Sequence, residues 1–117
     1  MAQHAVITAD VDGVITAWNP AAESMFGHPA TVAIGQRVDF VIPEPFREAH
    51  WNGFRRAMTA PEIKDLAADM PVLCADGEIR DFPARLLALS DALGQAIGAM
   101  AIYTDEGTTG LHPFPLD

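Results

Sequence analysis

Two Asp-Gly pairs constrain the fold of this chain more than any other feature of its sequence. Asp12-Gly13 and Asp76-Gly77 each separate two short apolar runs, and a polar stretch at 90–95 precedes one more. Asp-Gly favours tight hairpin turns because glycine adopts positive φ without a steric cost. Strands joined by such turns pair antiparallel. The predicted strands are residues 5–9, 14–18, 70–73, 79–89 and 96–103.

Helical signals fill the stretch between the second and third predicted strands. Asn19 is a helix cap followed by proline at the first helical position, and Gly27 ends that helix. A second start at Pro43 opens the longest predicted helix, which extends to about Thr59 and is broken by Pro61. The order ββ, helices, βββ predicts an α+β domain, with an antiparallel sheet and short helices packed on one face. Shorter helical pieces are predicted at 30–34 and 38–41.

The length and charge of the chain narrow its class. Its 117 residues suit one domain, expected at 1–105, and a flexible tail rich in glycine and proline is expected at 106–117. The net charge is -9, from 16 acidic and 7 basic residues. Nucleic acids and anionic membranes attract clustered Lys and Arg, so neither is an expected partner.

Cysteine usage and the motif search point to a cytoplasmic, non-catalytic protein. Cys74 is the one cysteine, so neither an internal disulfide nor a multi-cysteine zinc site is expected. The N-terminus lacks the pattern of a signal peptide, and no apolar run approaches the ~20 residues that span a bilayer. There is no nucleophile elbow, phosphate loop or metal-ligand cluster, so no enzymatic role is expected.

A longer motif joins the first turn to the first helix. From Asp12 to Gly27 the sequence reads D-G-x-I-x-x-W-N-x-x-A-E-x-x-F-G, and Asp76-Gly77 and Gly98 extend the pattern. This arrangement resembles the PAS family over roughly residues 4–105. The resemblance implies a five-stranded antiparallel sheet that cups short helices around an internal pocket. PAS domains host many unrelated ligands, so the fold alone assigns no activity.

The long predicted helix carries the most specific ligand hypothesis. Its segment from Ile42 to His50 is similar to haem-based oxygen-sensor PAS domains, in which the histidine at this position is the proximal haem ligand. The resemblance implies that His50 binds the iron of haem b. His50 and Phe54 share the apolar face of the helix, as presentation to an apolar cavity requires. Further pocket candidates are Met70 and Met100, as distal sulfur ligands, and Ile102 as apolar lining.

Other interpretations of the same residues stay open. His50 is equally a core or helix-surface histidine of the PAS scaffold, and residues 66–70 lack the arginine that some haem sensors carry there. Trp18 and Trp51 are expected to pack against the core and a helix flank rather than to bind a ligand. Flavin is not expected, because residues 35–40 lack the cysteine of flavin-binding PAS domains. The arginines at 47, 55 and 56 are candidates for pairing with haem propionates, or form an ordinary solvated face.

The function implied by the resemblance is sensing. A small ligand in the pocket, most specifically haem b on His50, would report a gas or a redox change to a homodimer or signalling partner. The alternative is a cofactor-free interaction module that dimerises, or docks on a kinase, through the outer face of the sheet.

Overall fold

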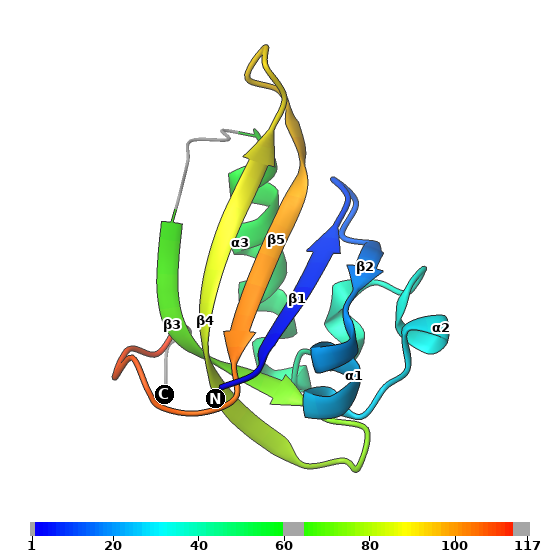
Figure 1. Ribbon diagram of the computed structural model, residues 1–117. Coiled ribbons are helices and arrows are strands. Elements are labelled where there is room, and N and C mark those ends of the chain that lie inside the picture. The colour runs from blue at the N-terminus through cyan, green and yellow to red at the C-terminus, as the bar shows by residue number, and fades with distance from the viewer. Residues whose placement is uncertain (1, 60–64, 114–117) are drawn as a thin grey trace.

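The computed structural model describes residues 2–59 and 65–113. Five strands form one antiparallel sheet in the order β2-β1-β5-β4-β3, and helix α3 lies behind β4 and β5 in Figure 1. The predicted α+β class is confirmed. The elements are β1 (His4–Ala9), β2 (Ile15–Trp18), α1 (Pro20–Phe26), α2 (Ala30–Ala33), the 3-10 helices η1 (Val38–Val41) and η2 (Glu44–Phe46), α3 (Arg47–Thr59), β3 (Asp65–Leu73), β4 (Ile79–Ser90) and β5 (Ala96–Thr104).

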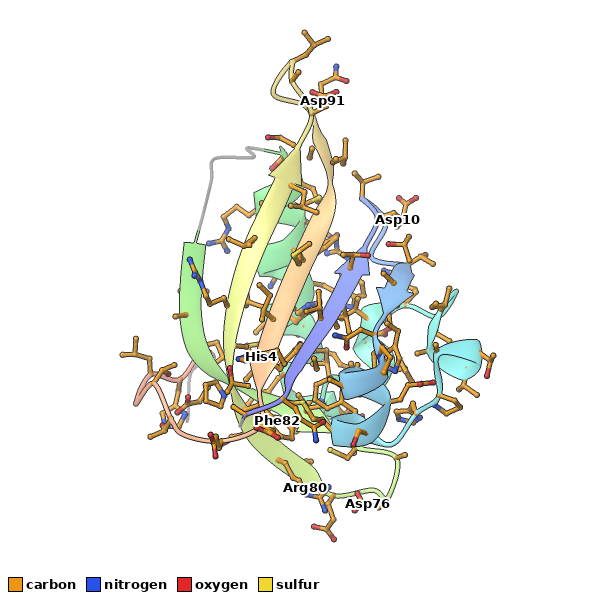
Figure 2. All side chains as sticks on the ribbon, viewed as in Figure 1. His4, Asp10, Asp76, Arg80, Phe82 and Asp91 are labelled. Carbon is orange, nitrogen blue, oxygen red and sulfur yellow. The ribbon has the colours of Figure 1, made fainter. Side chains whose placement is uncertain are left out.

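An aspartate organises each of the three hairpin turns. Asp10, Asp76 and Asp91 lie at these turns (Figure 2). Each carboxylate accepts a hydrogen bond from the backbone N–H two residues on, at distances of 2.9 to 3.0 Å. Such bonds hold the turn without help from distant residues. This local chemistry is why the turns were predictable from the sequence.

Asn19 links the first helix to the first strand. Its Oδ1 accepts from the N–H of Ala22 at 2.9 Å, which caps α1, and from the N–H of Val6 at 3.0 Å. Its Nδ2 donates to the carbonyl of His4 at 3.0 Å. The predicted cap is confirmed, and the same side chain fixes where α1 sits against β1.

Phe26 lies at the centre of the packed core. Its ring meets three others edge to face, with centroid distances of 5.6 Å to Trp18, 5.4 Å to Phe82 and 5.0 Å to Tyr103. Phe26 is 1% exposed. Trp18 also donates from Nε1 to the carbonyl of His28 at 2.9 Å. The dense part of the core therefore lies between α1 and the sheet, away from the long helix α3.

Strand β3 is longer than its sequence pattern predicted. It begins at Asp65 rather than at Met70, and it forms one edge of the sheet. Pro83 suggested an edge or a bulge in the fourth strand. It pairs with Asp69 of β3, and the pairing of β4 with β5 begins one residue later, at Ala84, so Pro83 lies just outside the β4–β5 pairing. The expected helix break at Pro61 lies outside the described residues.

The segment after β5 follows a defined path as far as Pro113. In Figure 1 it crosses β4 partway along that strand and reaches the edge of β3. The flexibility of the tail predicted from residue 106 stays a prediction. Within it, residues 108–110 donate hydrogen bonds to the carboxylate of Asp69. Residues 114–117 of the predicted tail lie outside the described residues. Among the described helices, none is long and apolar enough to cross a membrane.

Candidate functional site

A cavity of about 890 Å³ lies between α3 and the inner face of the sheet. No residue of α3 is buried, so the helix stands off the sheet. Small residues on both walls explain the space. On the helix, Ala49, Gly53 and Ala57 line it at a spacing that keeps them on one face.

The sheet wall of the cavity is equally small. Ala99 of β5 pairs with Ala9 of β1 on one side and with Ala88 of β4 on the other, and all three line the cavity. A row of alanines opposite a helix of alanine and glycine leaves room that larger side chains would fill. The other lining residues are Ile7, Thr8, Val38, Ile42, His50, Asn52, Phe54, Arg56, Leu66, Met70, Leu86, Leu87, Met100, Ala101, Tyr103 and Pro113.

His50 is a titratable side chain on the wall of this cavity. Burial lowers the pKa of its imidazole to about 4, and the negative charge of Asp39 opposes this only in part. The imidazole is therefore neutral at pH 7. Its Nδ1 is buried and has no hydrogen-bond partner among the described residues. A neutral imidazole with unused hydrogen-bonding capacity is the form that binds a transition metal.

An aromatic cluster positions the imidazole. The ring of Phe54, one turn along α3, stacks on it with a centroid distance of 6.2 Å and an interplanar angle of 26°. Trp51 meets both rings edge to face, at 5.1 Å from His50 and 5.5 Å from Phe54. Arg37 places its guanidinium 4.3 Å from the centre of the Trp51 ring. The aromatic rings therefore pack against the imidazole of His50, which also lines the cavity.

Four of the five predicted pocket residues line the cavity: His50, Phe54, Met70 and Met100. Met70 is only 2% exposed. Met100 borders the cavity, but along β5 it alternates with Ala99 and Ala101, which face inward opposite core residues of β1. Alternation therefore places the Met100 side chain on the outer face of the sheet.

Ile102 shares the outer face with Met100 and does not line the cavity. Its assignment to the pocket, and that of Met100 as a distal ligand, are corrected by the strand register. The reason is physical: β5 is apolar on both faces, so hydrophobicity alone could not tell the inner residues from the outer ones.

The remaining candidates separate clearly. Trp18 and Trp51 do not line the cavity, in agreement with the packing roles predicted for them. Of the three arginines, only Arg56 does, whereas Arg47 donates from Nε to the carbonyl of Ile42 at 3.0 Å. Cys74 is buried, as expected of a small apolar residue. The described residues contain no group of three or more His, Cys, Asp or Glu side chains that could hold a metal ion.

The small residues that create the cavity were not among the predicted site residues. Ala88, Ala99 and Gly53 carry no chemical group that a motif search would notice. The sequence pattern that could have indicated the cavity is the alternation of alanine along the last two strands, together with alanine and glycine on one face of the long helix. Tyr103 was also missed; its ring is buried, which raises the pKa of its hydroxyl.

Comparisons with known proteins agree with this architecture. A family model for the PAS fold matches residues 2–108. An uncharacterised protein of Azorhizobium caulinodans is 38% identical over 85 residues, which is 70% of this chain and 11% of that protein. Sensor protein FixL of Bradyrhizobium diazoefficiens is 38% identical over 58 residues, or 50% of this chain and 12% of that protein. This chain therefore spans about a tenth of the length of these curated relatives.

Solved structures show the same fold. The PAS domain of a protein from Colwellia psychrerythraea superposes with a TM-score of 0.75 at 23% identity, covering 86% of this chain and 83% of that one. The PAS-B domain of Drosophila melanogaster Cycle with bound ethylene glycol gives 0.69 at 12% identity, covering 86% and 96%. A family match over nearly the whole chain, a five-stranded sheet and a cavity beneath the long helix lead to one conclusion: the chain belongs to the PAS family.

Proposed function

We propose that this PAS domain senses through a ligand in the cavity beneath α3, and that the ligand is haem b held by His50. The observation that carries the proposal is His50 itself, a neutral imidazole on an apolar cavity wall with no hydrogen-bond partner for its buried Nδ1 among the described residues. The similarity of residues 42–50 to haem-based sensors supports this choice of ligand. The match to a protein named as a sensor supports the sensory role.

The residues around the cavity fit a haem. The volume of about 890 Å³ lies within the range of about 300–1,000 Å³ found for cofactor sites. Met70 lines the cavity from β3, and Arg56 adds a cation that suits a carboxylate. When bound, haem supplies an iron centre that responds to gases or to redox state.

The position of α3 is a second argument for an occupant. Helices in proteins gain most of their stability by burying one face, and α3 buries no residue completely. A flat apolar molecule between the helix and the alanine row would give that face a partner. His50 would then hold the occupant, Phe54 would fix the ring plane of the imidazole, and the small residues would leave the space.

The test is an absorption spectrum of the folded protein after addition of haemin. We expect a strong Soret band that is lost in His50→Ala and retained in His4→Ala, because His4 is an exposed histidine at the start of β1. Gly53→Leu is a second control. A Cβ at Gly53 would meet no atom within 4 Å, so leucine fills the cavity without disturbing the helix and should block uptake while His50 remains. No Soret band in the folded wild type refutes the proposal, and a band that survives in His50→Ala removes His50 as the ligand.

The outer face of the sheet favours a second candidate function. It carries half-buried apolar side chains from three adjacent strands, which suits a protein interface. We infer that, without a cofactor, the domain would act by pairing with a second copy or a signalling partner through this face. Light scattering of the wild type and of Ile102→Lys tests homodimerisation through this face. We expect a dimeric wild type and a monomeric variant, and a monomeric wild type contradicts homodimerisation. The residues concerned are Val6, Leu87, Leu89, Met100 and Ile102.

A further inference from the structure

Residues 105–113, here called the strap, are fastened to the sheet by a single carboxylate. Asp69 of β3 is 7% exposed. Its Oδ1 accepts from the N–H of Thr109 at 2.7 Å and from the hydroxyl of Thr109 at 2.9 Å. Its Oδ2 accepts from the hydroxyl of Thr108 and from the N–H of Gly110 at 3.3 Å. The backbone adds a bond in the other direction, from the N–H of Asp69 to the carbonyl of Leu111 at 2.8 Å.

Beyond these bonds, the strap is held at its start, where the carboxylate of Asp105 accepts from the N–H of Gln3 at 3.0 Å and its own N–H donates to the carbonyl of Gln3 at 3.3 Å. Every residue from Asp105 to His112 is exposed, and Leu111, its largest apolar side chain before Pro113, is 59% exposed. Apolar burial therefore contributes little to its position. The donors to Asp69 lower the pKa of its carboxyl to about 2, so the acceptor stays ionised at neutral pH. Bonds to a charged acceptor are the stronger class of hydrogen bond.

The strap ends at the cavity. Pro113 lines the main cavity, and with His112 it also lines a smaller hollow of about 150 Å³ that Phe46, directly before α3, and Asp69 share. Met70, the next residue of β3, turns its side chain to the cavity wall. The strap thus bridges the edge of β3 and the start of the helix that bears His50.

We propose that the strap closes the rim of the cavity between β3 and α3, and that Asp69 is the latch that keeps it closed. Loss of the Asp69 carboxylate removes its four hydrogen bonds to residues 108–110. The strap then keeps the backbone bond of Leu111 and the bonds between Asp105 and Gln3, so Pro113 leaves the rim more often. The inference concerns access to the same cavity and does not depend on haem being its occupant.

Hydrogen exchange tests the latch in the ligand-free protein. The amides of Asp69, Thr109 and Gly110 donate the bonds described above, so each reports on it directly. In Asp69→Ala we expect the amides of Thr109 and Gly110 to exchange at least about fivefold faster, the factor for one net hydrogen bond. Glu78→Ala, which removes an exposed acid in the turn between β3 and β4, is the control and should leave them unchanged. Unchanged exchange in Asp69→Ala overturns the latch.

Thiol labelling tests the rim. The chain has one cysteine, so Cys74→Ser with Ala101→Cys places a single thiol on the cavity wall, at a position that is 9% exposed. We expect dithionitrobenzoate to label it at least about fivefold faster when Asp69→Ala is added, and not when Glu78→Ala is added. Equal labelling rates in all three proteins overturn the rim closure, whether or not the protein binds haem. Should Asp69→Ala fail to fold, Thr108→Val with Thr109→Val removes two donors and leaves the strand intact, and the same rates decide.

Discussion

The contact between Gly13 and Trp51 offers a prediction whose size follows from geometry. Gly13 lies in the turn between β1 and β2 with φ at +81°. A Cβ at this position would lie 2.3 Å from Cη2 and 2.5 Å from Cζ3 of Trp51 on α3. Arg37 lies over the same ring, so the indole is held from a second direction. Gly13→Ala therefore adds backbone strain and a steric clash together.

The two costs can be given separate magnitudes. Positive φ costs a residue with a Cβ about 1–2 kcal/mol. Overpacking against a held side chain costs about 1–3 kcal/mol. Gly13→Ala should then lower the free energy of unfolding by about 2–5 kcal/mol. Gly77 has nearly the same φ, at +85°, but an added Cβ there would meet no atom within 4 Å. Gly77→Ala should therefore cost only the backbone strain of about 1–2 kcal/mol.

Urea unfolding followed by far-UV circular dichroism measures both variants. The decisive comparison repeats Gly13→Ala in a Trp51→Ala background, where the clash is gone and the strain remains. In that background Gly13→Ala should cost no more than Gly77→Ala does in the wild type. If Gly13→Ala costs the same with and without Trp51, the ring does not lie against the turn and the reasoning is refuted.

Two further predictions concern Asn19 and His50. Asn19→Ala should lower the free energy of unfolding by about 2–3 kcal/mol, because it removes the cap of α1 and both links to β1. Asn19→Asp keeps the acceptor bonds and should cost clearly less. Equal unfolding midpoints for the two variants in urea would contradict this. Burial lowers the pKa of His50 to about 4 from 6.5, so the unfolded chain binds more protons between these values and stability falls as the pH drops from 6.5 to 4. His50→Gln should flatten this part of the stability curve, and an unaltered slope would show that His50 does not cause it.

The fold was largely predictable because its signals are local. The side chains of Asp10, Asp76 and Asn19 each accept a hydrogen bond from a backbone N–H within four residues. Short stretches of sequence are therefore enough to predict these turns and this cap. The start of β3 was missed because the strand lies at an edge, where one partner and a few apolar contacts replace a clear alternating pattern. The strap was missed because Asp69 and Thr109 are 40 residues apart.

The candidate site was predictable only in part, for a different reason. His50 and Phe54 could be placed because helical spacing puts them on one face. Met100 and Ile102 could not, because the register of β5 against β1 decides which of its apolar residues face inward. The volume of the cavity depends on small residues of α3 and the sheet meeting across space, and no single segment encodes that.

The two edges of the sheet have a consequence for the behaviour of the protein in concentrated solution. Along β2, Ile15 exchanges backbone hydrogen bonds with Gly35 and Gln36 at 2.9 and 2.8 Å. Along β3, the N–H of Asp69 donates a hydrogen bond to the carbonyl of Leu111. Pro71, two residues further along the strand, has no N–H to donate. Exposed edges are the templates on which proteins add strands to one another and grow fibrils. With these positions taken by its own backbone, the chain resists that route to aggregation, and freeing residues 105–113 would reopen it at β3.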